Sequence, residues 1–234
     1  NMEKNICIIP LRSGSKGIKN KNIKKINKIP LCMFVISETI KSNIFEKIFI
    51  AIDEKKYEDL ILKYLKFLKI SKKKIIFFYR SKKSSTDIAQ TEIVLKEVIE
   101  KNNKYKNCFL IQATSPLLLY SDIRNSNKIL KEGYDSIFSS YISKKFFWKF
   151  VKNKICSLNY NYLKRTLRQN SSDTFIENGA IYGFNIRGFL DKNNRLFGRI
   201  AHYVMPEKRS LDIDTKKDFV QAKKKLESRF SKFK

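Results

Sequence analysis

The chain has few of the residues that bind transition metals. It contains one histidine, His202, and four cysteines, Cys7, Cys32, Cys108 and Cys156, which are far apart and form no C-x-x-C pair. The ligand spacing of a zinc site is therefore absent. Cys7 and Cys108 lie inside apolar runs, where a buried free thiol is the expected state of a cysteine. This pattern predicts a reducing compartment.

Long apolar runs are also lacking. No stretch of ~18 or more apolar residues is present to cross a bilayer, and the first residues lack the charged and then apolar pattern of a secretion signal. We therefore expect a cytoplasmic protein with no membrane partner.

Acidic residues are few beside the basic ones. The chain has 22 Asp and Glu against 50 Lys and Arg, a formal net charge of +28. Such an excess ordinarily indicates nucleic acid or an anionic membrane. Here the lysines are spread along the whole chain, as a compositional bias of the genome would spread them, and no RNP pattern occurs. An RNA-binding protein that stacks bases on Phe146, Phe147 or Trp148 is the rival from another class, but we expect no nucleic-acid partner.

Apolar runs alternate with segments of helical spacing. The expected strands are 5–10, 47–53, 74–79, 108–112 and 135–140, and the expected helices are 31–44, 55–69, 90–102 and 121–132. Continuous apolar strands indicate burial on both faces, and the alternation predicts an α/β fold with a mostly parallel, Rossmann-like sheet flanked by helices. In such a sheet the ligand binds at the carboxyl ends of the strands. We expect one domain, residues 1–234.

The pattern changes after residue 140. Residues 141–175 are rich in aromatic and basic side chains without helical spacing, which predicts an inserted arm. A strand near 180–186 and a closing helix over about 215–229 follow. Asn178 and Gly179 are expected to form a turn before that strand.

A lysine-rich loop with two glycines follows the first strand. Residues 8–22 are IIPLRSGSKGIKNKN. Glycines let backbone N–H groups close on an anion, and lysine and arginine add charged donors, so the loop predicts a cradle for a triphosphate. It matches neither the P-loop pattern nor the dinucleotide fingerprint. The expected phosphate ligands are Arg12, Ser15, Lys16, Lys21 and Asn22.

A pair of aspartates lies near the carboxyl end, in the segment RSLDIDTKKDF. In an extended chain Asp212 and Asp214 point to the same side, and Mg²⁺ at phosphate sites commonly binds one or two carboxylates. The pair is thus a candidate magnesium site, with capping of the next helix by Asp214 or Thr215 as the simpler alternative. His202 lies outside these segments, and we expect a structural role for it.

Five segments together resemble the acylneuraminate cytidylyltransferases, also called CMP-sialic acid synthetases, including the synthetases for legionaminic and pseudaminic acid. The segments are LRSGSKGIKNKN, SSTDIAQTE at 84–92, IQATSPL at 111–117, NGAIY at 178–182 and SLDID at 210–214. The resemblance implies a nucleotide-diphospho-sugar transferase type of fold, a homodimer built through the inserted arm, and transfer of CMP from CTP to a nonulosonic acid with release of pyrophosphate. A cytidylyltransferase for the eight-carbon sugar Kdo is the nearest enzymatic alternative.

The same resemblance implies roles for single residues. Arg80 corresponds to an arginine near the base, and Asp212 and Asp214 to magnesium carboxylates. The residues that correspond to sugar-binding positions are Gln112, Lys149, Arg168 and Tyr182. Lys21, Arg12 and Asp214 are the expected catalytic residues, Asp214 as a possible base. Ala113, Leu118 and the pair Ile176 and Glu177 depart from the family pattern, which leaves the sugar unnamed.

Overall fold

The computed structural model describes residues 4–13, 17–85, 90–165, 167 and 173–226. The strands of its main sheet are β1 (Asn5–Pro10), β4 (Lys47–Ile52), β5 (Ile75–Tyr79), β6 (Asn107–Ile111), β7 (Ser136–Ser143), β10 (Thr174–Asn185) and β11 (Ile200–Val204). The helices are α1 (Leu31–Ser42), α2 (Lys55–Phe67), α3 (Thr91–Glu100), α4 (Tyr120–Leu130), α5 (Ile186–Lys192) and α6 (Lys216–Leu226). Short strands β2 (Lys25–Ile26) and β3 (Ile29–Pro30) pair with each other.

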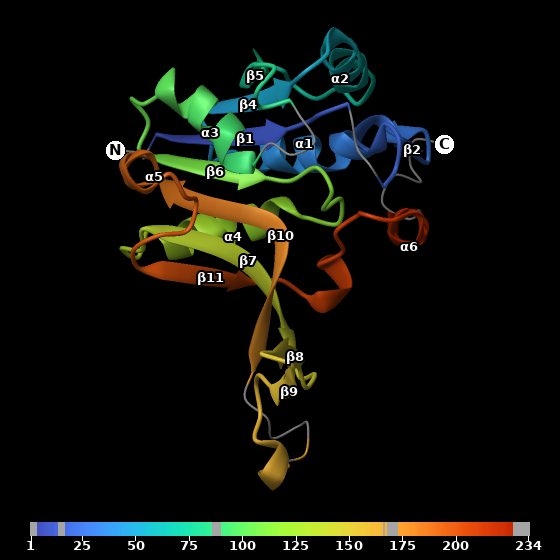
Figure 1. The fold of residues 1–234 in the computed structure, drawn as a ribbon. Coiled ribbons are helices and arrows are strands. Elements are labelled where there is room, and N and C mark those ends of the chain that lie inside the picture. The colour runs from blue at the N-terminus through green and yellow to red at the C-terminus, as the bar shows by residue number, and fades with distance from the viewer. Residues whose placement is uncertain (1–3, 14–16, 86–89, 166, 168–172, 227–234) are drawn as a thin grey trace.

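The seven strands form one sheet in the order β11-β7-β10-β6-β1-β4-β5 (Figure 1). All neighbouring pairs are parallel except those of β10, which runs antiparallel to both β6 and β7. The prediction of a mostly parallel α/β sheet is confirmed. The single reversed strand was not predicted, because the residues of a buried strand have the same apolar pattern in either direction.

Alternate residues of the central strands supply two separate cores. In β1, Cys7 and Ile9 pack with α1, α2, α4 and α6 on one face of the sheet, while Ile6 and Ile8 pack with α3 and α5 on the other. The helical spacing expected within 90–102 is confirmed, because the apolar side chains of α3 face the second core. Cys7, Cys32 and Cys108 are buried free thiols, and Cys156 is an exposed one.

One sequence-based expectation for the last third of the chain was wrong, and two elements there were not predicted. Asn178 and Gly179 do not form a turn before a strand; they lie inside β10, where the register against β7 shifts between Glu177 and Tyr182. Gly179 has φ +72°, which is the conformation that glycine favours, and here it makes a bulge instead of a turn. The Asn178 amide oxygen accepts from the Ala180 N–H and holds the bulge. Strand β11 and helix α5 were not predicted, because both are short.

A two-stranded hairpin extends beyond the main sheet between β7 and β10. Strands β8 (Trp148–Val151) and β9 (Lys154–Ser157) form it, and Figure 1 shows it projecting from the body of the molecule. The segment expected as an arm, 141–175, also contains the ends of β7 and β10, which pair as far as Thr174 and Ser143. The arm therefore continues two strands of the sheet instead of starting at a loop.

The structure contains no helix, within the described ranges, that is long and apolar enough to cross a membrane. The closing helix expected over 215–229 begins at Lys216 and is described to Leu226.

A buried carboxylate joins α4 to β11 and to the segment that follows this strand. Asp122 of α4 is 0% exposed and accepts from the Arg209 guanidinium, in one bond of 2.8 Å and a second, shorter one. It also accepts from the Tyr203 hydroxyl at 3.0 Å and from the Leu119 N–H at 2.9 Å.

Arg209→Ala is expected to lower the free energy of unfolding by about 3 kcal/mol, because it leaves a buried carboxylate without its counter-charge. Urea denaturation followed by circular dichroism measures this. Arg187→Ala, at an exposed arginine of α5, is the matched control and should change stability by less than about 0.5 kcal/mol. A loss below about 1 kcal/mol for Arg209→Ala would show that the pair is not a structural anchor.

Candidate active site

A cleft of about 260 Å³ lies at the carboxyl ends of the parallel strands. Its lining comes from five parts of the chain: the end of β1 with the loop after it, the residue after β5, the first turn of α3, the turn after β6 and the segment before α6. The lining residues are Pro10, Arg12, Lys21, Asn22, Arg80, Thr91, Val94, Gln112, Ala113, Thr114, Asp212 and Asp214. Seven of these twelve residues are among the site residues expected from the sequence, and the cleft lies at the edge of the sheet where the ligand is expected.

The loop after β1 is joined directly to the aspartate segment. Lys21 Nζ donates to the Ile213 carbonyl at 2.6 Å and lies 3.2 Å from Asp214 Oδ1. Gly17 approaches the same segment so closely that a Cβ there would lie 2.3 Å from the Asp214 carbonyl oxygen. A glycine is required at position 17 because any side chain would separate the two segments. Ser15 and Lys16, also expected in this cradle, lie outside the described residues.

Side-chain hydrogen bonds hold the backbone of the loop after β1 in place. The Arg12 carbonyl accepts from the Tyr57 hydroxyl at 3.1 Å and from the Asn22 amide at 3.3 Å. Ser13 donates through its N–H and its hydroxyl to Asp53 Oδ2, both at 2.9 Å. The Asn22 amide nitrogen therefore orients the loop that carries Arg12. Asp53 was not identified from the sequence, although its place directly after β4, at the carboxyl edge, is a usable signal.

Asp212 and Asp214 lie on the same side of an extended segment, as predicted, although the segment is not a strand of the sheet. Ile213 between them is 0% exposed, and its N–H donates to the Thr114 carbonyl at 2.9 Å. The helix-capping alternative also holds in part. The Thr215 hydroxyl accepts from the Asp218 N–H, and Asp218 Oδ2 accepts from the Thr215 N–H, so Thr215 caps α6 while both aspartates line the cleft.

The electrostatics of the two aspartates differ. Burial, and then the neighbouring charge of Asp214, raise the pKa of Asp212 above its ordinary value, against the hydrogen bond from Thr114 and the charge of Lys21. The Asp214 side chain is 73% exposed. Among the described residues no group of three or more His, Cys, Asp or Glu gathers for a metal. Two carboxylate oxygen donors suit Mg²⁺ that also binds phosphate oxygens and water.

Arg80 forms the opposite wall of the cleft. Its guanidinium donates to the Ser84 carbonyl, and burial lowers the pKa of this side chain. The turn that supplies this carbonyl is held by Glu97 of α3, whose carboxylate accepts from the Ser84 hydroxyl at 2.7 Å and from Ser81. Burial alone would raise the pKa of Glu97, but the hydrogen bonds from Ser81 and Ser84 and the charge of Arg80 lower it overall.

Glu97→Gln is expected to raise the KM for a ligand that contacts Arg80 about threefold to tenfold. The reason is that a neutral amide holds the 81–85 turn, and with it the Ser84 carbonyl that binds Arg80, less firmly. Because the folded pKa of Glu97 is lowered, its carboxylate stabilises the fold above the unfolded pKa, and this contribution is lost as the pH falls through the folded pKa. Thermal melts of the variant and the wild type should therefore converge on acidification toward pH 3. Melts that stay equally far apart from pH 7 to pH 3 would contradict this assignment.

Gln112 and Tyr182 lie beyond the aspartates, at the other side of the cleft. A Cβ on Gly179 would lie 3.8 Å from Asp212 Oδ2 and 3.9 Å from Gln112 Nε2, so the bulge of β10 adjoins both side chains. The Tyr182 hydroxyl donates to Glu177. Burial, and then the hydrogen bond to Glu177, raise the pKa of Tyr182. Tyr182 does not line the cleft itself but lies next to it.

One expected sugar-binding residue, Lys149, does not lie at the cleft of its own chain: it is exposed in β8 of the arm, where it pairs with Cys156. Arg168, also expected to bind the sugar, lies outside the described residues. His202 has the structural role that was expected, since its Nδ1 lies 3.2 Å from the Ser140 hydroxyl and its ring packs against Phe175.

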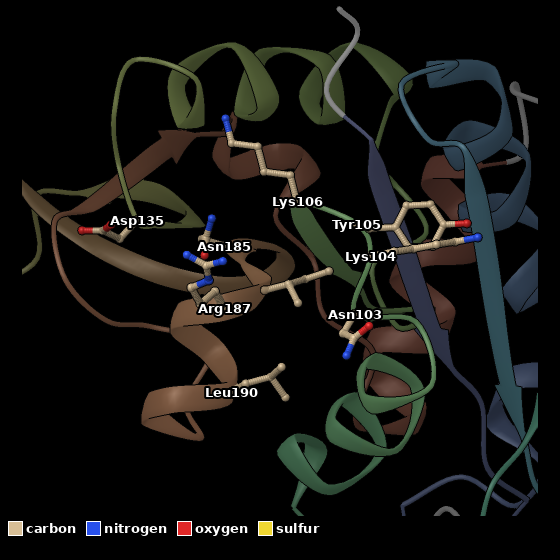
Figure 2. A pocket seen from close by; sticks show the side chains of 9 residues that line it. Asn103, Lys104, Tyr105, Lys106, Asp135, Asn185, Arg187 and Leu190 are labelled. Atoms are coloured by element: carbon tan, nitrogen blue, oxygen red, sulfur yellow. The ribbon is translucent and has the colours of Figure 1, made fainter.

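A larger hollow of about 720 Å³ lies at the opposite edge of the sheet, away from the candidate site. Figure 2 shows Arg187 and Leu190 on its α5 side, with the segment 103–106 on the other. Two of its polar side chains already bind backbone groups. The Asn185 amide oxygen accepts from the Gly188 N–H, and Asp135 accepts from the Arg199 N–H. These two polar side chains are therefore explained by their contacts within the fold.

Two solved structures share the architecture of this chain. The chain is similar to a CMP:2-keto-3-deoxy-manno-octonic acid synthetase complexed with CTP, with a TM-score of 0.69 and 13% identity over 97% of this chain and 100% of that one. It is also similar to 4-diphosphocytidyl-2C-methyl-D-erythritol synthase of Anaerococcus prevotii, with a TM-score of 0.68 and 10% identity over 96% of each chain. The chain therefore shares its fold with these two enzymes.

Sequence comparison identifies the family of the chain. Residues 6–230 match the family described as Cytidylyltransferase, and the chain belongs to that family. It is 31% identical to N-acylneuraminate cytidylyltransferase A of Danio rerio over 94% of this chain and 50% of that protein. It is 26% identical to pseudaminic acid cytidylyltransferase of Campylobacter jejuni over 94% of this chain and 95% of that protein. The chain thus spans about half the length of the N-acylneuraminate enzyme and nearly all of the pseudaminic one.

Proposed function

We propose that this protein transfers CMP from CTP to a nonulosonic, sialic-acid-like sugar acid and releases pyrophosphate. The observation that carries the proposal is the meeting of Lys21 and Arg12 with Asp212 and Asp214 in one cleft at the carboxyl edge of the sheet. The names of the related cytidylyltransferases for N-acylneuraminate and pseudaminic acid support it. Because CTP is a cytoplasmic metabolite, the proposal includes a cytoplasmic location.

The reaction is an in-line attack by the anomeric hydroxyl of the sugar acid on the α-phosphorus of CTP. The new bond joins that oxygen to phosphorus, and the bond to the β-phosphate oxygen breaks with departure of pyrophosphate. Lys21 and Arg12 stabilise the charge that develops on the leaving group, which is the main form of catalysis in such transfers. Asp214, exposed in the cleft, accepts the hydroxyl proton. Arg80, which lines the cleft, is proposed to contact the base, and Ser15 and Lys16 are proposed to bind the phosphates.

Asp212 and Asp214 are proposed to hold Mg²⁺. The donor set fits this ion, because two carboxylates leave coordination positions for phosphate oxygens. When bound, the ion neutralises phosphate charge and polarises the oxygens that it contacts. The chain's own contribution is to hold the two carboxylates on one side of the buried Ile213.

The test of this proposal is pyrophosphate release by the purified protein with CTP, Mg²⁺ and a panel of acids: N-acetylneuraminic, legionaminic and pseudaminic acid, and Kdo. Turnover with a nine-carbon acid supports the proposal. Turnover with Kdo alone would replace it by the Kdo alternative, and silence with every acid would overturn it. Tight RNA binding with a steep salt dependence and no response to nucleotides would favour the nucleic-acid rival.

We also propose that the arm joins two copies of the chain. Its hairpin exposes large apolar side chains, including Phe150 at 69% and Ile155 at 61%, which pair directly across β8 and β9. Exposed apolar clusters of this kind mark contact surfaces. Lys149, in the same hairpin, would then lie near the interface.

Wild-type protein is expected to have about twice the monomer mass of 27.7 kDa in size-exclusion chromatography with light scattering. The double variant Phe150→Ser with Ile155→Ser should shift it to the monomer mass at micromolar concentration, because the apolar contact is lost. Val220→Ser, at a 54% exposed side chain of α6, should remain a dimer. A monomeric wild type would refute the proposal.

A further inference from the structure

A single carboxylate lies between two arginines at the carboxyl edge of the sheet. Strands β1, β4 and β5 are neighbours and parallel, so the residues that follow them leave the sheet side by side. Asp53 directly follows β4, and it lies between Arg12, two residues beyond β1, and Arg80, directly beyond β5. Both arginines line the cleft, whereas Asp53 does not. Any effect of Asp53 on the position of a ligand is therefore indirect.

On the β1 side, Asp53 holds the backbone next to Arg12. Its Oδ2 accepts from the Ser13 N–H and from the Ser13 hydroxyl, both at 2.9 Å. Two hydrogen bonds from one residue to a carboxylate fix the direction in which the chain leaves β1. The Tyr57 hydroxyl, which donates to the Arg12 carbonyl at 3.1 Å, holds the same turn. The position of Arg12 in the cleft therefore depends on Asp53.

On the β5 side, Asp53 interacts with Arg80 through charge. The Arg80 N–H donates to the Ile52 carbonyl at 2.8 Å, which places Arg80 beside the end of β4. Burial lowers the pKa of Arg80, the charge of Asp53 acts against this effect, and the charge of Arg12 acts in the same direction as burial. Asp53 Oδ1 and Arg80 Nε are both buried and have no hydrogen-bond partner among the described residues. Asp53 thus compensates two cations that repel each other.

We propose that Asp53 is a positioning residue that sets the spacing between Arg12 and Arg80 and thereby the grip of the cleft on the two ends of CTP. The inference rests on the proposed function, which assigns Arg12 to the phosphates and Arg80 to the base. The carboxylate attracts both guanidinium groups and holds the loop that carries Arg12, so two like charges keep a fixed separation before CTP binds. Such preorganisation lowers the cost of binding, and a small displacement of a binding group is costly.

A role of Asp53 through charge alone predicts the opposite sign. A negative charge beside a phosphate site repels the ligand, so its removal would strengthen CTP binding if repulsion were its only effect. If Asp53 positions the arginines, its removal weakens CTP binding. The direction of the change therefore distinguishes the two roles.

The test measures the affinity for CTP by titration calorimetry with Mg²⁺ and without sugar acid, so that no turnover occurs. Asp53→Asn keeps the shape of the side chain and removes its charge, and it should raise the Kd for CTP about tenfold. Calorimetry also gives the number of sites per chain. A merely structural role would lower this number, because part of the protein is unfolded, and would leave the Kd unchanged. Asp59→Asn, at an exposed aspartate of α2, is the matched control and should keep the wild-type Kd.

A double variant shows whether Asp53 acts on the pair of arginines. In the background of Arg80→Gln, Asp53→Asn should raise the Kd less than threefold, because no spacing between two arginines is left to set. An equal tenfold rise in both backgrounds would overturn the inference. Asp53→Glu keeps the charge but displaces the carboxylate by a methylene group, and it should raise the Kd about threefold. This variant decides the matter if Asp53→Asn fails to fold.

The possible outcomes are distinct. Unchanged or tighter CTP binding by Asp53→Asn overturns the inference while the proposed function survives, and so does a lower number of sites with an unchanged Kd. CTP binding by the wild type without turnover of any acid overturns the proposed function, and the affinities still decide the role of Asp53 because the titration contains no acid. A wild type that does not bind CTP overturns both.

Discussion

Asp212→Asn is expected to lower kcat by about 10³-fold at saturating CTP and acid. The substitution keeps the shape of the side chain and removes one of the two carboxylates that we assign to Mg²⁺, and losing a group that stabilises transition-state charge costs factors of this order. Initial rates of pyrophosphate release over a series of Mg²⁺ concentrations measure the effect. High Mg²⁺ should not restore the rate.

Although Asp212→Asn lowers kcat, it should not lower the stability of the fold. Burial and the charge of Asp214 raise the pKa of Asp212 in the folded protein. A carboxyl with a raised folded pKa costs stability above its unfolded pKa, and this cost disappears as the pH falls below that value. In the absence of metal at pH 7, Asp212→Asn is therefore expected to melt at the wild-type temperature or above it.

Asp191→Asn is the matched control, since this aspartate of α5 is 67% exposed and pairs with Lys192. It should retain wild-type turnover. An Asp212→Asn variant that keeps more than a third of the wild-type kcat would remove Asp212 from the site. A variant that loses activity only because it melts well below the wild type would leave the residue with a structural role.

Lys21→Met is expected to lower kcat by about 10²-fold to 10³-fold and to raise the KM for CTP. The methionine fills a similar volume but removes the cation that lies 3.2 Å from Asp214 and donates to the Ile213 carbonyl. The variant thus loses a donor for the departing pyrophosphate and also the link between the cradle and the aspartate segment. Steady-state kinetics with CTP as the varied substrate separates the two constants.

Lys25→Met provides the comparison, because Lys25 of β2 is exposed and does not line the cleft. It should behave as the wild type in both constants, which shows that the general loss of one positive charge is harmless. If Lys21→Met and Lys25→Met have the same small effect, Lys21 acts only through long-range charge and the proposed role in the cleft is wrong.

The positions of the phosphate cradle and the aspartate pair were accessible from the sequence for a local reason. Glycines and lysines directly after an apolar strand, and aspartates two residues apart, have a geometry that the backbone itself imposes. From the sequence, Gly17 was expected only to give the backbone conformational freedom. The structure adds that the Asp214 carbonyl lies where a side chain would be.

The surroundings of Tyr182, next to the cleft, depended on contacts that a local sequence pattern does not encode. Tyr182 lies on a strand that runs against its neighbours, and the bulge at Gly179 turns Glu177 toward the tyrosine hydroxyl. Arg195 reaches the same ring from the segment after α5, and it pairs there with Glu92. A resemblance to known enzymes directed attention to Lys149 instead, which this chain carries on the arm.

The sequence by itself determined most strands and most helices, the loop after β1 and the common direction of Asp212 and Asp214, because periodicity and backbone geometry act over a few residues. Only the tertiary structure decided the reversal of β10, the bulge at Asn178 and Gly179, and the meeting of Arg195 with Tyr182. These depend on which strands become neighbours, and that choice is made by burial of the whole sheet between its two cores.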